Sequence, residues 1–161
     1  MLTPPPLNDQ GHVAPHNHTQ ILDSDYVIRL ISSEWQVLDE KFPEGKRLSS
    51  VAWEPSSELN GGVSVVLESL LIADELNIPE FITSSRYPAS IKMNVGSIRQ
   101  HNFQVGYDPV KDEPSISDNP YHCQIWGVTT KGKQNLLKNI SSWVVALNNV
   151  SLGRNADRIQ I

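Results

Sequence analysis

The stretch GVSVVLESLLIADELN, residues 62–77, changes its hydrophobic period halfway along. Within residues 62–67 every second side chain from residue 63 is apolar, as in a half-buried strand whose side chains point alternately to the two faces of a sheet. From Leu67 onward the leucines follow a helical period. The stretch therefore predicts a strand that leads into a helix, which Asn77 and Pro79 end.

Most other patterned segments indicate strands. Alternation or β-branched side chains predict them at residues 26–32, 47–53, 91–95, 103–107 and 121–128. The clearest helix is predicted at about 131–147, where apolar residues recur at helical spacing. Because strands come in runs with few helices between them, we predict an α+β fold. Its mainly antiparallel sheet is packed by one long C-terminal helix and one shorter helix.

The length of 161 residues fits one domain. Residues 1–24 contain three consecutive prolines and no apolar periodicity, which predicts a flexible tail. The globular domain is expected at 25–148, and residues 149–161 are expected to form a weakly ordered C-terminal tail.

Composition narrows the class of function. A net charge of −5 makes nucleic acid an unlikely partner, because nucleic-acid binding usually needs a basic face. The single cysteine, Cys123, cannot form an internal disulfide. The start of the chain lacks a signal-peptide pattern, and no apolar run approaches the roughly 20 residues needed to cross a bilayer. We expect a cytoplasmic protein without a membrane segment.

His122 and Cys123 are adjacent in the stretch DNPYHCQIWG, residues 118–127. Neighbouring strand residues point to opposite faces, so the two side chains are not expected to form a nucleophilic couple. Cys123 is interpreted as a small buried hydrophobe. His122 lies beside an acidic loop, where it serves either as an acid or base or as a structural hydrogen-bonding group. It shares a mixed face with Gln124 and Trp126, two candidate ligand contacts.

Arg29 falls on an apolar stripe of the first predicted strand, between Val27 and Ile31. An unpaired buried guanidinium is costly. We expect that it pairs with a carboxylate such as Asp39 or Glu68, that it holds a bound anion, or that it snorkels to solvent at an edge of the sheet.

Two further groups have open roles. Ser49 and Ser50, on the predicted strand at 47–53, are expected to contact either a ligand or the backbone of a neighbouring strand. His12, His16 and His18 are imidazoles in the predicted tail, but no cysteine or carboxylate completes a ligand set. We interpret these histidines as part of a solvated tail and predict no metal site.

The segments RLSSVAWEPS, GGVSV, VGYDP and DNPYH together resemble a family of small uncharacterised bacterial proteins. Members of that family share an R-x-S-S-x-A-aromatic segment, a G-x-S-V segment and a late N-P-x-H. The resemblance covers roughly residues 26–145. It implies a bacterial domain and no established activity.

The order of an arginine on the first strand and serines on the second is similar to that of ADP-ribosyltransferase-like domains. The resemblance implies that Arg29 contacts an NAD phosphate and that Ser49 and Ser50 support the nicotinamide ribose. It assigns no residue to the family's catalytic glutamate, because Gln104 and Gln124 stand where a carboxylate is expected. An active transferase is not predicted from this pattern.

Two hypotheses of function follow. The first is an accessory bacterial domain that binds a partner protein, without a cofactor, since four tryptophans are many for this length and aromatic residues anchor interfaces. The second is a nucleotide- or NAD-binding, enzyme-like domain that takes an anionic small molecule. It requires Arg29, one of the two serines and His122 to converge on one cleft.

Overall fold

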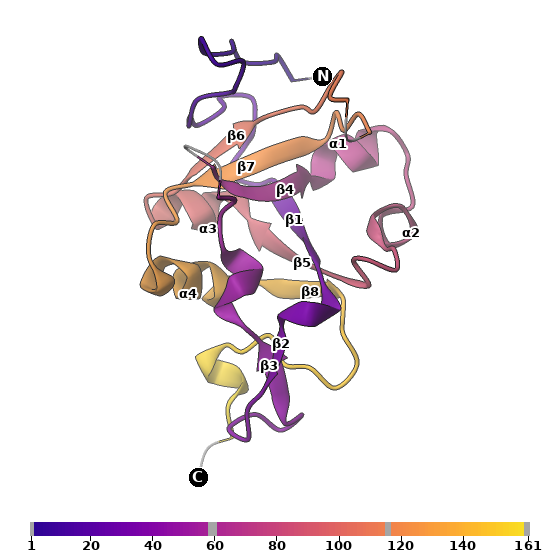
Figure 1. The fold of residues 1–161 in the computed structure, drawn as a ribbon, viewed down its shortest axis with the longest axis vertical. Coiled ribbons are helices and arrows are strands. Elements are labelled where there is room, and N and C mark those ends of the chain that lie inside the picture. The colour runs from indigo at the N-terminus through magenta and orange to yellow at the C-terminus, as the bar shows by residue number, and fades with distance from the viewer. Residues whose placement is uncertain (1, 58–60, 115–116, 160–161) are drawn as a thin grey trace.

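A computed structural model describes residues 2–57, 61–114 and 117–159. Its centre is a six-stranded sheet with the order β6-β7-β4-β1-β5-β8, in which every neighbouring pair is antiparallel (Figure 1). The strands are β1 (Tyr26–Ile31), β4 (Val63–Leu67), β5 (Ala89–Asn94), β6 (Gln104–Tyr107), β7 (His122–Trp126) and β8 (Ser142–Val145). A second sheet pairs β2 (Gln36–Leu38) with β3 (Lys46–Leu48). The predicted α+β fold with a mainly antiparallel sheet is confirmed.

Short helices connect the strands. They are α1 (Glu68–Ala73), α2 (Ile78–Ile82), α3 (Val95–Gln100) and α4 (Lys131–Asn139), with 3-10 turns η1 (Ser33–Trp35), η2 (Ser50–Trp53) and η3 (Asn155–Asp157). The change of period at Leu67 is the junction of β4 and α1, as predicted. Among the described residues, no helix is long and apolar enough to span a membrane.

The C-terminal helix is shorter than predicted. It begins at Lys131 but ends at Asn139, and residues 142–145 form β8 instead of a second helical half. Ser141 marks the break, because its buried hydroxyl donates to the carbonyl of Leu137 and accepts from the indole N–H of Trp53. The following β-branched residues pair with β5, with Trp143 opposite Ile91. The apolar spacing that suggested one helix belongs to two elements.

The strand predicted at 47–53 is also shorter. It ends at Leu48, and Ser49 caps the 3-10 turn η2 by accepting a hydrogen bond from the N–H of Val51. The turn places Trp53 in the core, where it is fully buried.

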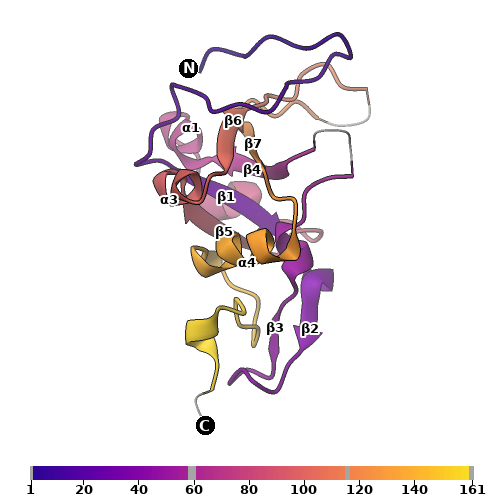
Figure 2. The same ribbon diagram turned by 90° about the vertical axis from the view of Figure 1, so that its left-hand side faces the viewer.

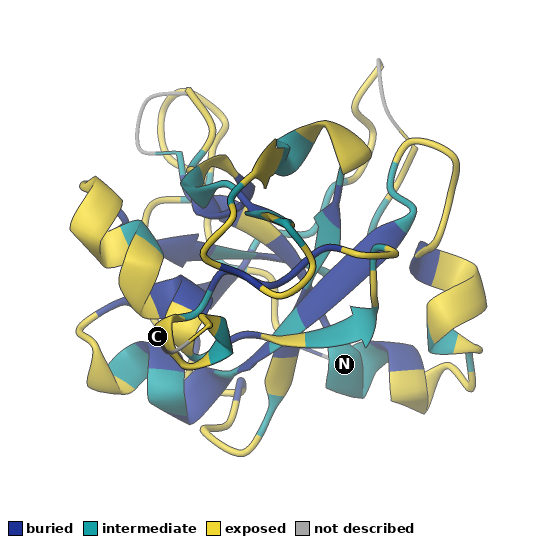
Figure 3. Ribbon diagram, turned by 90° about the horizontal axis from the view of Figure 1, so that it is seen from below, coloured by how far each residue is buried: buried dark blue, intermediate teal, exposed yellow. Residues whose placement is uncertain are grey.

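The sheet is covered on both faces. On one face, Ile98 of α3 and Leu137 of α4 join the main core with Val27, Val65 and Cys123 (Figure 2). On the other face, Leu71 of α1 and Ile82 of α2 form a smaller cluster with Ile28 and Val66 of the sheet. Burial concentrates in the strands, and much of the helix and loop surface is exposed (Figure 3).

The described residues of both predicted tails, 2–24 and 149–159, contact the domain, and residues 1, 160 and 161 lie outside the described residues. In the N-terminal segment, Ile21 is buried and the N–H of His18 donates to the carbonyl of Val105 on β6. In the C-terminal segment, Leu152 is buried and Ser151 forms a parallel β-bridge with Arg47 of β3. These segments show no hydrophobic periodicity because they form no regular helix or strand. Single apolar side chains and backbone hydrogen bonds nevertheless attach them to the domain.

Candidate functional site

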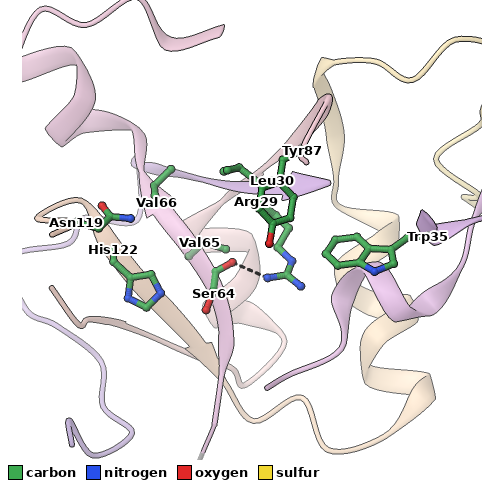
Figure 4. A pocket seen from close by; sticks show the side chains of 9 residues that line it. All are labelled: Arg29, Leu30, Trp35, Ser64, Val65, Val66, Tyr87, Asn119 and His122. Carbon is green, nitrogen blue, oxygen red and sulfur yellow. Dashed lines mark hydrogen bonds between the residues drawn. The ribbon is translucent and has the colours of Figure 1, made fainter. Parts of the chain in front are cut away.

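The candidate site lies where the central pair of strands stops pairing. β1 pairs with β4 only at Val27 with Leu67 and at Ile28 with Val66. On its other side, β1 stays paired with β5 up to Ile31. A cavity of about 280 Å³ opens at this point. Its lining residues are Arg29, Leu30, Trp35, Ser64, Val65, Val66, Tyr87, Asn119 and His122 (Figure 4).

Arg29 reaches into the gap between the two strands. Its Nε donates to the carbonyl of Ala52 and its Nη1 to the carbonyl of Ser64, both at 3.0 Å. Its guanidinium carbon lies 5.1 Å from the ring centroid of Trp35, which is a cation–π contact. Burial lowers the pKa of the guanidinium to about 10, an effect that the neighbouring Tyr87 opposes. Arg29 therefore remains charged at neutral pH.

Neither of the two carboxylates predicted as partners, Asp39 and Glu68, forms an ion pair with Arg29. Asp39 accepts from Arg47 at 2.7 Å, and Glu68 belongs to none of the ion pairs in the described part of the chain. Within those same residues, Nη2 of Arg29 makes no hydrogen bond. The guanidinium thus keeps donors that can serve a ligand.

His122 lies across Ser64 from Arg29 (Figure 4). Its Nδ1 is 2.7 Å from the main-chain carbonyl oxygen of Asp108, which can only accept, so Nδ1 carries the hydrogen. Nε2 of the neutral ring is therefore an acceptor. The carboxylate of Asp108 lies 3.7 Å from Nδ1, so the histidine has the acidic-loop neighbour that the sequence suggested.

Gln124 and Trp126, the other residues of the predicted mixed face, do not line the cavity. The side chain of Gln124 donates to the carboxylate of Asp108 and accepts from the N–H of Gly62, which ties two loops to β7. Trp126 is only 3% exposed, and its ring centroid lies 5.3 Å from that of His16. The predicted mixed face therefore brings only His122 to this cavity.

Ser49 and Ser50 also lie outside the cavity lining. Ser49 satisfies the backbone of η2 and Ser50 begins that turn. The structure thus brings together Arg29 and His122 of the predicted cleft and leaves out both serines. The serine that does line the cavity is Ser64, from the neighbouring strand β4.

Cys123 points to the main core, away from the cavity. It is fully buried, and burial raises the pKa of its thiol. The prediction that Cys123 is a buried hydrophobe and forms no couple with His122 is confirmed. Tyr121 does not share that core face: it packs against the second cluster, and its hydroxyl donates to Asp74 at 2.6 Å.

Trp35, Tyr87 and Asn119 were not anticipated at the site. Each lies outside the six-stranded sheet: Trp35 ends η1, Tyr87 precedes β5 and Asn119 precedes β7. Only pairing between distant strands brings these residues to Arg29. Ser64 had a weak signal, because it occupies a polar position in the alternation of residues 62–67.

Comparisons with protein-family models, curated proteins and solved structures find no match to this chain. Among the described residues, no group of three or more histidine, cysteine, aspartate or glutamate side chains is arranged to hold a metal ion. The cavity lining offers one cation, one imidazole acceptor, two aromatic rings, two hydroxyls (Ser64 and the phenol of Tyr87) and one amide.

Proposed function

We propose that the cavity binds a small anionic molecule that carries a planar ring, of the size of a mononucleotide. The observation that carries the proposal is the charge of Arg29, which faces the cavity without a carboxylate partner among the described residues. A desolvated cation is stabilised by an opposite charge. An anionic group on Nη2 supplies that charge and uses the remaining donors of the guanidinium.

The aromatic residues favour a ligand with a ring. Trp35 and Tyr87 line the cavity next to the guanidinium, and both are partly exposed. Planar ligands stack on such side chains, whose orientation is fixed at small entropic cost. A volume of about 280 Å³ is at the lower end of the range for ligand sites, which suits a phosphate or carboxylate group with one ring system.

The same features argue for binding without transferase chemistry. No aspartate or glutamate is among the described residues that line the cavity, and Ser49 and Ser50 are not there to support a ribose. Of the residues that the ADP-ribosyltransferase resemblance assigns to NAD, Arg29 alone meets the cavity. His122 supplies Nε2 as an acceptor for a ligand hydroxyl or ring N–H.

Thermal unfolding with AMP, NAD or inorganic phosphate at millimolar concentration tests the proposal. A ligand at 100 times its Kd adds about 2.7 kcal/mol to the free energy of unfolding, a shift of several degrees. We expect the largest shift with AMP and a smaller shift with phosphate. Trp35→Ala and His122→Gln should reduce the AMP shift, because both remove contacts in the cavity.

The matched control is Arg158→Gln, which removes one positive charge from the exposed C-terminal segment. It should leave the AMP shift unchanged. A shift that survives Trp35→Ala and His122→Gln, or that Arg158→Gln reduces as much, would place the anion outside the cavity. No shift with any of these three probes would refute binding of this ligand class.

Binding of a partner protein is the second candidate function. It is favoured by Phe81 on α2 and Ile72 on α1, which are 51% and 59% exposed although both are large and apolar. The buried Trp53 and Trp126 do not support it as interface anchors. A partner recovered with the wild-type chain should be lost with Phe81→Ser, while Leu38→Ser on β2 serves as a matched exposed control. Equal recovery by the two variants would exclude this surface.

A further inference from the structure

The N-terminal segment is attached to the edge strand β6 through a histidine ring whose two nitrogens are both hydrogen-bonded. Nδ1 of His16 lies 2.8 Å from the carbonyl oxygen of Ala14, so this nitrogen carries the hydrogen. Nε2 of the same ring accepts the backbone N–H of Tyr107 at 3.3 Å. A proton on Nε2 would therefore face another N–H donor.

His18 is held in the same way with the two nitrogens exchanged. Its Nε2 lies 2.7 Å from the carbonyl oxygen of Thr3, and its Nδ1 accepts the backbone N–H of Gln20 at 3.1 Å. His18 is also buried, at 8% exposure. In both rings one nitrogen meets a group that only accepts and the other meets a group that only donates, so neither ring can gain a proton without losing a hydrogen bond.

The segment occupies the free edge of the six-stranded sheet. The backbone N–H of Val105 donates to the side chain of Asn17, and the carbonyl of Val105 accepts from the N–H of His18. The ring of His16 lies over β6, where a Cβ at Gly106 would come within 2.7 Å of it. Residues 16–18 thus satisfy the backbone groups that an edge strand leaves unpaired.

In the described part of the chain, no acidic group pairs with either ring to offset the charge that protonation would add. The titratable or charged groups that face the two rings are each other, with centroids 5.9 Å apart, the phenol of Tyr107, and Arg99, which donates to the carbonyl of His18. Asp23 is paired with Arg99 at 2.8 Å. In the described residues no carboxylate forms an ion pair with either ring. His122 differs, because it has Asp108 beside it.

From this geometry we infer that protonation of His16 and His18 releases the N-terminal segment and exposes the edge of β6. Histidine is the side chain that proteins most often use as a switch of charge in mild acid. Arg99 also donates to the carbonyl of Ile21 and to the carboxylate of Asp23, and neither bond involves the two histidine rings. The released segment therefore stays tethered, and the freed edge is open to an extended strand.

Amide hydrogen exchange of the full chain, followed by NMR at pH 7.5 and 5.5, tests this inference. After correction for the intrinsic exchange rate, the protection of Tyr107 and Val105 should fall by about tenfold or more at pH 5.5, the factor that corresponds to one lost hydrogen bond. Ile28, in the centre of the sheet, should keep its protection.

The double variant His16→Gln/His18→Gln keeps a donor and an acceptor at each position and gains no charge in acid, so its β6 protection should be independent of pH. His101→Gln, an exposed histidine at the end of α3, is the control and should behave as the wild type. Full protection of wild-type Tyr107 at pH 5.5, or the same loss in the double variant, overturns the inference. If the double variant is unprotected already at pH 7.5, the wild-type ring ¹⁵N shifts decide: loss of protection in step with ring protonation supports the inference, and loss at a different pH contradicts it.

Discussion

Nη1 of Arg29 donates a 3.0 Å hydrogen bond to the main-chain carbonyl of Ser64, just beyond the last paired residues of β1 and β4. The guanidinium replaces a backbone donor there, because it donates to a carbonyl that would accept from a backbone N–H if the two strands were still paired. It holds the two strands together and also lines the cavity between them. Stability and the proposed ligand binding therefore depend on the same side chain.

Arg29→Met should lower the free energy of unfolding by roughly 2–4 kcal/mol, because it leaves the carbonyls of Ala52 and Ser64 without their donors. Urea unfolding followed by circular dichroism measures the change. Arg158→Met, at an exposed position, is the control and should cost well under 1 kcal/mol. Equal stability of the two variants would show that the hydrogen bonds of Arg29 do not support the fold.

Gly106 and Gly132 form a matched pair. A Cβ at Gly106 would lie 2.5 Å from the ring of Trp126 and 2.6 Å from that of His16, whereas the nearest atom at Gly132 is 3.8 Å away. Gly106→Ala should therefore destabilise the protein and reduce the protection of the β6 amides. Gly132→Ala, within α4, should stabilise it by about 0.5–1 kcal/mol. Unfolding curves that rank the two variants in the opposite order would contradict the packing of His16 on β6.

The thiol of Cys123 should be inert in the folded protein. It is fully buried, and burial raises its pKa, so at pH 8 almost no reactive thiolate is present. A thiol-reactive disulfide reagent should modify it only at the rate of unfolding and rapidly in concentrated urea. Fast modification of the native protein at pH 8 would mean that β7 does not point Cys123 into the core.

Asp39 should make stability depend on pH in acid. Its hydrogen bond from Arg47 lowers the pKa of the carboxyl below 3.8, helped by the backbone N–H of Lys41. A depressed carboxyl pKa stabilises the fold above the unfolded value, and that contribution is lost as the pH falls through the folded value. Asp39→Asn should therefore reduce stability at pH 6 and flatten its decline below about pH 4. An unchanged pH profile in this variant would show that the pair contributes nothing.

Several elements could be predicted because their signals are local. The period change at Leu67 gave the junction of β4 and α1, and the alternation around Ile91 and Cys123 gave β5 and β7. The helix predicted at residues 131–147 is too long for a physical reason. Leu137 and Trp143 both pack against the same core, so their spacing resembles that of one helix, although a turn at Ser141 separates them. Hydrophobic periodicity indicates which residues are buried, but it does not show where one element ends and the next begins.

The site was less accessible to prediction. The position of Arg29 on an apolar stripe predicts that its guanidinium needs a partner. The partners are the backbone carbonyls of Ala52 and Ser64, which cannot be predicted from a pattern of side chains. Trp35 and Tyr87 reach the cavity through strand pairings between distant parts of the chain. The attachment of His16 likewise depends on β6, about ninety residues away in sequence.

The most direct test of the proposed ligand site is an NMR titration of the ¹⁵N-labelled protein with AMP, which follows the Nε–H signal of Arg29, the indole N–H of Trp35 and the ring nitrogens of His122. Binding in the cavity predicts that all three shift together and saturate at one Kd, while the backbone amides around Arg158 stay in place. Saturating shifts confined to other residues, or no shift at millimolar AMP, would contradict the account.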